Sequence, residues 1–316
     1  MKTALVMGIT GSFGGHVARA LTQQGWTIRV LMRDPMKVPT EFSGARVFKG
    51  DAADIDSVRA AAQGVDLIIY GVNPPYCEWA TSVVPWLDNT ATVAEELGIA
   101  VVFPGNVYIF NPEDGSEFDE AARARPVNAK GKLRQAMEER LQRAAQHGAR
   151  VIIVRAGDFI AAGAKSAWMQ ALIKRTKAGY ALSAPAERSL THSWAYLPDL
   201  ARSVAALVEQ RNTLPPFSVF HFRGYRLSFN ELADAIRTTT GLPVVLKAFP
   251  WWLLRLATPF STFVRSLFEM RYLWEHELNL SDQKLRATLR SPVASTPVGQ
   301  ALLESGLISK AEPRSR

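Results

Sequence analysis

Gly8-Ile-Thr-Gly11-Ser-Phe-Gly14-Gly15 is the stretch around which this sequence is organised. It follows the short apolar run 4–7 and leads into residues 16–24, where apolar side chains recur at helical spacing. A short apolar run of this kind is typical of a buried parallel strand, so the order is strand, glycine turn and helix. In such a turn, one glycine allows the tight bend, a second lets backbone N–H groups approach a pyrophosphate, and a third lets the helix pack on the strand. The stretch therefore predicts a dinucleotide site at the positive N-terminus of a helix.

The next strand, residues 27–33, indicates which dinucleotide is bound. An acidic residue at its end binds the ribose 2′-hydroxyl of NAD, whereas an arginine accommodates the 2′-phosphate of NADP. Arg33, with Lys37 close behind, favours NADP over NAD, although Asp34 would favour NAD if the strand ended one residue later. Arg33 as a solvated loop charge is the alternative. The cofactor contacts expected in the glycine turn are Gly8, Thr10, Gly11, Ser12, Phe13 and Gly14.

Strand-like and helix-like segments alternate over the first half of the chain, which predicts an α/β fold with a doubly wound parallel sheet. We expect a Rossmann domain over residues 1–157, completed by about 194–224. Residues 158–193 and 225–316 depart from the alternation. They are expected to form a smaller, mostly helical cap that binds substrate.

Composition narrows the class of protein. The chain has 316 residues, of which 47% are hydrophobic, and this is enough to bury a large core. Its single cysteine, Cys77, excludes an intrachain disulfide, and no apolar run reaches membrane-spanning length. The net charge of +8 is scattered, and no His, Cys or carboxylate cluster has metal-ligand spacing. We expect a cytoplasmic protein with a small-molecule substrate and no metal, nucleic-acid or membrane partner.

The G-x-x-G-x-x-G spacing of the turn resembles that of the short-chain dehydrogenase/reductase superfamily. The resemblance is to its extended and atypical members, the NAD(P)-dependent epimerase/dehydratase-like proteins. It covers nearly the whole chain and places Gly50-Asp51 near the adenine of the cofactor. Asp51 as a cap of the following turn is compatible with that role.

The catalytic residues of the resembled superfamily are only partly matched. Its fifth strand ends in a Ser-Ser-x-x-Val-Tyr-Gly-like pattern, and aligning Phe110-Asn111 with Tyr-Gly puts Asn106 at the position of the serine that polarises the substrate oxygen. Asparagine can still donate a hydrogen bond. The usual Tyr-x-x-x-Lys pair is missing, and Lys130 and Arg134 stand nearest to its two positions.

Three interpretations of Lys130 and Arg134 remain open. Lysine releases a proton near neutral pH only when burial or a nearby positive charge destabilises its ammonium, and Arg134, one helical turn away, would act in that direction. Alternatively, both residues bind cofactor phosphate or ribose hydroxyls, and the proton comes from Tyr108, Tyr76 or water. A solvated basic helix face is the third interpretation.

Aromatic residues suggest where substrate binds. Tyr76 and Trp79 follow tandem prolines in a loop that leaves the C-terminal end of the fourth strand, where open parallel sheets place ligands. The alternative, equally favoured, is a stiff loop whose aromatic side chains pack on the next helix. His192 is a weaker candidate for the substrate cleft. The aromatic segment 249–274 is interpreted as an apolar lid, a homodimer surface or a membrane-facing surface. A helix pair packed on the core of its own domain is the simplest interpretation, and we prefer it.

Two functional hypotheses follow. The first is an NADP-dependent oxidoreductase or epimerase-like enzyme that acts on a small carbonyl or hydroxyl compound, with Asn106 polarising the oxygen, Lys130 or a tyrosine as proton source and Arg134 as cofactor anchor. The second is a non-catalytic NADP-binding sensor, which the missing Tyr-x-x-x-Lys pair favours.

Overall fold

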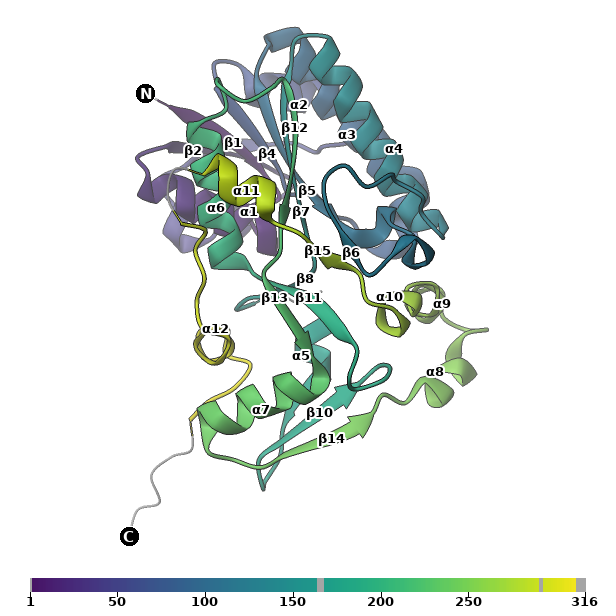
Figure 1. The fold of residues 1–316 in the computed structure, drawn as a ribbon. Helices are drawn as coiled ribbons and strands as arrows, with labels where there is room; N and C mark the ends of the chain where they lie inside the picture. The colour runs from purple at the N-terminus through teal and green to yellow at the C-terminus, as the bar shows by residue number, and fades with distance from the viewer. Residues whose placement is uncertain (1, 164–167, 290–291, 311–316) are drawn as a thin grey trace.

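The computed structural model describes residues 2–163, 168–289 and 292–310. Its centre is a seven-stranded sheet of order β12-β7-β5-β4-β1-β2-β3, in which every neighbouring pair runs parallel (Figure 1). The strands are β1 (Thr3–Met7), β2 (Thr27–Met32), β3 (Arg46–Lys49), β4 (Leu67–Tyr70), β5 (Ala100–Asn106), β7 (Arg150–Ala156) and β12 (Phe217–Phe222). This confirms the predicted doubly wound parallel sheet.

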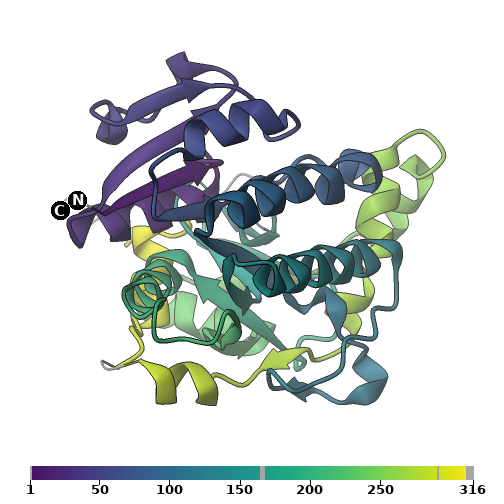
Figure 2. The same cartoon turned by 90° about the horizontal axis from the view of Figure 1, so that it is seen from above.

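Helices cover both faces of the sheet because its strands are apolar on both sides (Figure 2). In β1, Ala4 and Val6 belong to the core under α1 (Ser12–Gln23) and α6 (Leu197–Glu209). The alternate residues Leu5 and Met7 belong to the opposite core. The helices over that second core are α2 (Ile55–Ala62), α3 (Trp79–Leu97) and α4 (Ala129–Gln146).

The glycine turn brings three backbone segments closer together than side chains would permit. Gly8 has φ +83°, and a Cβ on it would lie 2.4 Å from the carbonyl oxygen of Gly71, beyond β4. A Cβ on Gly14, in the first turn of α1, would lie 2.5 Å from the carbonyl oxygen of Gly8. Glycine is therefore required at these positions so that α1 can begin directly against β1 and β4.

The cap lies beyond the C-terminal ends of the central strands (Figure 1). It contains two three-stranded sheets that the sequence pattern did not indicate. One is β13 (Tyr225–Ser228), β11 (Thr191–Tyr196) and β8 (Asp158–Ile160), and the other is β14 (Val244–Ala248), β10 (Tyr180–Ala184) and β9 (Ile173–Arg175). Its helices are α5 (Trp168–Leu172), α7 (Phe229–Thr240), α8 (Trp251–Ala257), α9 (Thr262–Glu269), α10 (Tyr272–Glu275) and α12 (Val298–Glu304).

Two further connections join the cap to the Rossmann domain. The short strand β6 (Glu117–Phe118) pairs with β15 (Asn279–Leu280), and α11 (Gln283–Thr288) returns to the sheet beside β12. Within the parts of the chain that the structure describes, none of the helices combines the length and the apolar character needed to cross a bilayer.

Substitution of Gly14 by alanine tests the close approach at the glycine turn. The added methyl group would overlap the backbone oxygen of Gly8, so we expect Gly14→Ala to lower the free energy of unfolding by about 1–3 kcal/mol. Chemical denaturation measures the loss. Gly44→Ala is the matched control, because no atom lies within 4 Å of the place that a methyl group on Gly44 would take, and the φ of Gly44 is not positive. Equal, small effects of the two substitutions would contradict the packing argument.

Candidate functional site

The candidate site lies along the edge where the parallel strands of the central sheet end. The register pairs Met7 with Tyr70 and Asn106 with Ala156, so the residues that follow these strands emerge side by side. These are the glycine turn, the segment 71–78, the turn after β5 and the start of β8. Ligands of open parallel sheets bind at this edge.

The N-terminus of α1 offers its first backbone N–H groups to a ligand. Gly11 is the N-cap residue and makes no side-chain cap, and the first turn of α1 holds no acidic residue. Thr10 and Gly11 are exposed. Phe13, by contrast, is buried in the core, so only its backbone is available to a cofactor. An uncapped helix N-terminus beside a glycine cradle fits a pyrophosphate.

The end of β2 presents a cation rather than a carboxylate. The side chain of Arg33 is 81% exposed, and its Nε lies 3.8 Å from Asp51 Oδ2. Asp34 instead caps the 3-10 helix η1 (Pro35–Lys37), because its Oδ1 accepts a hydrogen bond from the Met36 N–H at 3.1 Å. Lys37 Nζ lies 3.3 Å from Asp34 Oδ2. Asp51 also accepts a hydrogen bond from the Ala53 N–H, which agrees with its role as a turn cap.

Five of the predicted site residues form one group, which we call the aromatic–basic cluster: Tyr76, Trp79, Tyr108, Lys130 and Arg134. The hydroxyl oxygens of Tyr76 and Tyr108 are 2.9 Å apart and share a hydrogen bond. Lys130 Nζ lies 5.4 Å from the centre of the Tyr76 ring, and the Arg134 guanidinium lies 4.7 Å from the Trp79 ring. The two cations on α4 therefore stack on the two aromatic rings that flank the start of α3.

The cations of the cluster have partners that spacing along α4 did not indicate. Lys130 is buried and forms an ion pair with Glu269 at the end of α9. The ionic partner of Lys130 is thus a carboxylate from the cap. Arg134 Nη1 donates to the carbonyl of Pro104 at 3.3 Å, so the guanidinium also lies against β5.

Asn106 ends β5 and supports the tyrosine pair. Its Oδ1 accepts a hydrogen bond of 3.0 Å from the backbone N–H of Tyr108, at the start of the 3-10 helix η4 (Val107–Ile109). This cap uses the acceptor end of the side-chain amide. The NH₂ group of Asn106 is the end that could donate to a substrate oxygen, as the resemblance implies.

Burial makes both phenols of the cluster harder to ionise. It raises the pKa of Tyr76 and raises that of Tyr108 well above its usual value, and the negative charge of Asp158 acts in the same direction on both. Burial also raises the pKa of Asp158 to about 7. Near neutral pH both phenols are therefore protonated and can donate hydrogen bonds, whereas the Asp158 carboxyl is only partly ionised.

Asp158 is a titratable residue at the same edge of the sheet that the sequence reasoning did not single out. It opens β8, two residues after β7 ends, and pairs in register with Trp194. Its position directly after a buried strand that ends at the ligand edge was the available signal. The burial that changes its acidity could not be read from the sequence.

His192 occupies a different environment from the cluster. Its ring packs edge-on against Trp194, Phe229 and Trp274 in the core of the cap. Burial lowers its pKa to about 4, so the ring is neutral near pH 7. The structure thus brings Tyr76 and Trp79 together with the proposed catalytic residues and places His192 in an aromatic core.

A family model described as the NmrA-like family matches residues 1–281. The chain belongs to the NmrA-like family. A comparison with curated protein sequences finds no match.

Solved structures similar to this NmrA-like protein include three enzymes of low sequence identity. UDP-N-acetylglucosamine 4-epimerase from Bacillus cereus is 15% identical, with a TM-score of 0.72 over 97% of this chain and 95% of the epimerase. Thermus thermophilus UDP-glucose 4-epimerase in complex with NAD is 17% identical, with a TM-score of 0.70 over 96% and 98%. The Bordetella bronchiseptica enzyme WbmH in complex with NAD⁺ is 14% identical, with a TM-score of 0.71 over 96% and 97%. These likenesses show the shared fold.

A buried polar network joins β7 and β12 of the central sheet to α4. Arg155 on β7 forms an ion pair of 2.6 Å with Glu138 on α4, and its Nη1 lies 3.2 Å from His221 Nε2 on β12. Burial, followed by the positive charge of Arg155, lowers the pKa of His221 to about 3. A Cβ on Gly105 would lie 2.4 Å from Arg155 Cγ, so glycine makes room for the arginine.

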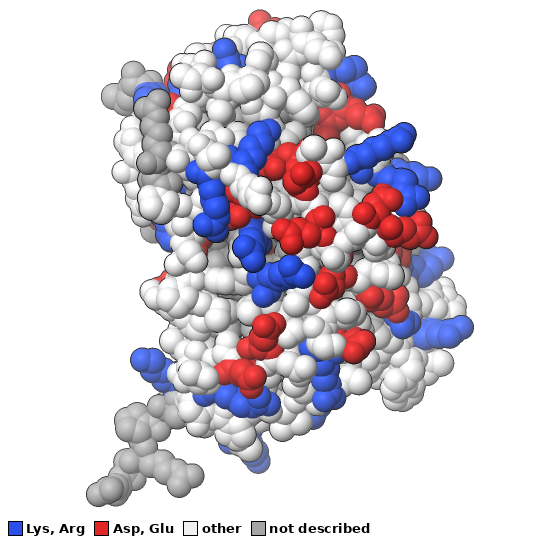
Figure 3. Space-filling view, viewed as in Figure 1, with Lys and Arg blue, Asp and Glu red and all other residues white. Residues whose placement is uncertain are grey.

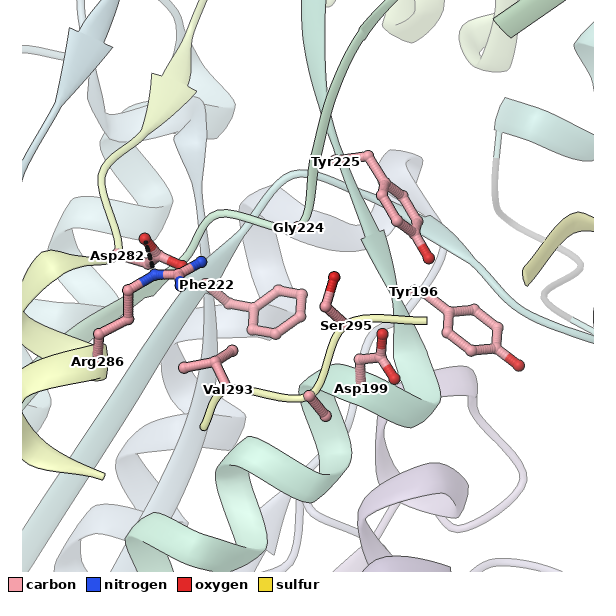
Figure 4. Close-up of a pocket in the computed structure, with 10 residues that line it drawn as sticks. Tyr196, Asp199, Phe222, Gly224, Tyr225, Asp282, Arg286, Val293 and Ser295 are labelled. Atoms are coloured by element: carbon pink, nitrogen blue, oxygen red, sulfur yellow. Dashed lines mark hydrogen bonds and ion pairs between the residues drawn. The ribbon is translucent and has the colours of Figure 1, made fainter. Parts of the chain in front are cut away.

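A small cavity beside the start of α6 has a structural role (Figure 4). Its volume of about 30 Å³ is enough for a water molecule. Asp199 in its wall accepts hydrogen bonds from the backbone N–H and the hydroxyl of Thr296, at 2.7 and 2.9 Å. Asp199 lies in the first turn of α6 and makes no cap of that helix; its carboxylate instead holds the segment that precedes α12 against α6.

The acidity of Asp158 predicts a pH dependence of stability. Its pKa is raised in the folded protein, so between about pH 4 and about pH 7 the folded state binds more protons than the unfolded state. This group therefore lowers the free energy of unfolding as the pH rises through that interval, by at most about 1.4 kcal/mol per pH unit. Asp158→Asn should remove this titration. The free energy of unfolding of the variant, relative to that of the wild type, should therefore increase as the pH rises.

Urea denaturation at a series of pH values measures this difference. The control is Asp234→Asn, because the side chain of Asp234 is 70% exposed on α7. A stability difference for Asp158→Asn that stays constant over the interval would show that Asp158 ionises normally.

Proposed function

We propose that this NmrA-like protein binds NADP and is an oxidoreductase or epimerase-like enzyme that acts on a small carbonyl or hydroxyl compound. The observation that carries the proposal is the hydrogen-bonded pair Tyr76–Tyr108, with Asp158 nearby, on the same edge of the sheet as the glycine turn. Hydrogen-bond donors and an acid that titrates near neutral pH are what a reaction at a carbonyl oxygen requires.

The shape of the glycine turn and the charge at the end of β2 support a cofactor site. The glycine cradle leaves free the space that side chains would fill, and the N-terminus of α1 has no side-chain cap. Arg33 is exposed where a 2′-phosphate would be recognised, while Asp34 is engaged as a cap of η1. The Thermus and Bordetella enzymes were solved with NAD, which makes NAD the competing outcome. When bound, the nicotinamide would supply or accept the hydride.

The residues around the cluster would have separate roles in the reaction. Tyr108 and the NH₂ group of Asn106 would hold the substrate oxygen, and Tyr76 orients the phenol of Tyr108 through their hydrogen bond. Asp158 would exchange the proton. Lys130 and Arg134 would act through charge, because each is held on an aromatic ring and paired elsewhere.

A non-catalytic NADP-binding sensor is the second candidate. The ion pair between Lys130 and Glu269 favours it, because this pair engages the residue nearest to the usual catalytic tyrosine and links α4 to the cap. In such a protein, the cap would report whether the cofactor is bound. Turnover distinguishes the two candidates.

Cofactor titration tests the first part of the proposal. We expect NADP(H) to bind more tightly than NAD(H), and Arg33→Ala to weaken NADP binding by roughly 10- to 100-fold while leaving NAD binding nearly unchanged. Isothermal titration calorimetry measures both affinities. Arg123→Ala, at another exposed arginine, is the control. An unchanged preference in Arg33→Ala would remove Arg33 from cofactor selection, and no binding of either dinucleotide at millimolar concentration would refute the proposal.

Conservative substitution of the tyrosines tests the second part. Tyr108→Phe should lower turnover of a carbonyl substrate by about 10²- to 10⁴-fold and leave cofactor affinity unchanged. Oxidation of NADPH is followed by absorbance with a panel of aldehydes, ketones and nucleotide sugars. Tyr180→Phe, which loses a hydroxyl bonded to Ser309 in the cap, is the control. Tight NADP binding without turnover of any panel member would favour the sensor.

A further inference from the structure

Helices α8 and α9 expose an unusual amount of apolar surface. Five large apolar side chains within twelve residues of sequence are more than half exposed. They are Trp252 (73%), Leu253 (51%), Leu256 (67%), Phe260 (90%) and Phe263 (60%). Elsewhere in the described chain, the exposed large apolar residues are the isolated Met36, Val127 and Val245. We call the five residues the apolar tip.

The apolar tip spans α8, the turn that follows it and the start of α9. Trp252, Leu253 and Leu256 lie on α8, Phe260 lies in the turn, and Phe263 lies in the first turn of α9. The inward face of the pair has its own anchors. Trp251 donates from its indole Nε1 to the carbonyl of Pro185 at 2.6 Å and packs on Phe268, whose ring centre is 5.2 Å away. The five exposed side chains therefore belong to a helix pair that is anchored to the cap through Trp251.

The charge around the apolar tip is positive. Residues 249–268 contain no Asp or Glu, whereas Arg255, Arg265 and the nearby Lys247 are exposed. The first acidic residue after this segment, Glu269, is paired with Lys130. In Figure 3, positive and negative side chains alternate across the middle of the molecule, while white and blue atoms predominate at the corner that α8 and α9 occupy in Figure 1.

The apolar tip projects from the molecule, so it can contact an extended flat surface. Both ribbon views place α8 and α9 at the outer edge of the molecule (Figures 1 and 2). A second copy of the chain is a poor match, because a two-fold interface would set each arginine-bearing patch against an identical one that lacks acidic residues. An anionic bilayer offers the opposite charge together with an apolar interior for Trp, Leu and Phe.

We propose that the apolar tip is a peripheral membrane-binding surface that inserts Trp252, Leu256 and Phe260 into the interface of an anionic bilayer, with Arg255 and Arg265 contacting lipid phosphates. This proposal replaces the expectation that the chain has no membrane partner, and it does not depend on the proposed enzymatic activity. Because Glu269 at the end of α9 pairs with Lys130, the docked surface would lie close to the candidate site.

Vesicle sedimentation with the full-length protein tests the proposal. We expect the protein to bind vesicles made of equal parts of phosphatidylcholine and phosphatidylglycerol, to bind phosphatidylcholine vesicles at least tenfold more weakly, and to be released by high salt. The double variant Trp252→Ser/Phe260→Ser should lose at least tenfold in binding to the anionic vesicles, because it removes the apolar contacts. Arg255→Gln/Arg265→Gln should abolish the preference for phosphatidylglycerol.

Two controls keep the result interpretable. Met36→Ser removes a 90% exposed apolar side chain elsewhere in the chain and should leave vesicle binding unchanged. Thermal unfolding should show that the tip variants keep the wild-type midpoint, since the substituted side chains are exposed. Vesicle binding that is absent, or equal in wild type and tip variants, would overturn the proposal. So would sedimentation equilibrium showing a wild-type dimer that the tip variants dissociate, which would assign the surface to a second copy.

Discussion

The structure depends on the close approach of three backbone segments at the glycine turn. The carbonyl oxygens of Gly8 and Gly71 occupy the space that side chains on Gly14 and Gly8 would need. This contact allows α1 to begin directly against the two central strands, with its first N–H groups open at the edge of the sheet. One steric constraint therefore sets the packing of the first βα unit and creates the part of the molecule that is suited to bind an anion.

The candidate site shows how residues of an unexpected type are accommodated by their surroundings. Lys130 and Arg134 stand near the positions of a tyrosine and a lysine in the resembled superfamily, and each stacks on an aromatic ring at the start of α3. A buried cation needs compensation, and a carboxylate from α9 supplies it for Lys130. The phenol groups of the cluster are instead those of Tyr76, in the loop after β4, and Tyr108, in the turn after β5. Burial keeps both of them neutral. The chemistry proposed for this edge thus depends on desolvation as much as on residue identity.

The cap influences the site through charge and burial. Glu269 reaches α4 from a helix far along the chain, and Asp158 opens a strand that pairs with β11 of the cap. The segment that contains Glu269 also carries the apolar tip, so one pair of short helices contacts the site on its inner side and presents apolar and basic side chains on its outer side. The preferred interpretation of this segment, a helix pair packed on its own core, describes Trp251 and Phe268 but not the five exposed residues.

The sequence by itself determined the doubly wound sheet and the glycine turn, because these follow from local signals: apolar periodicity, glycine spacing and the rule that parallel strands end together. It also placed Tyr76, Trp79, Lys130 and Arg134 in one region. Only the tertiary structure decided that Lys130 faces Glu269, that Asp158 is buried enough to change its acidity and that His192 lies in an aromatic core. Those outcomes depend on contacts between segments distant in sequence and on the exclusion of water, and no local pattern encodes either.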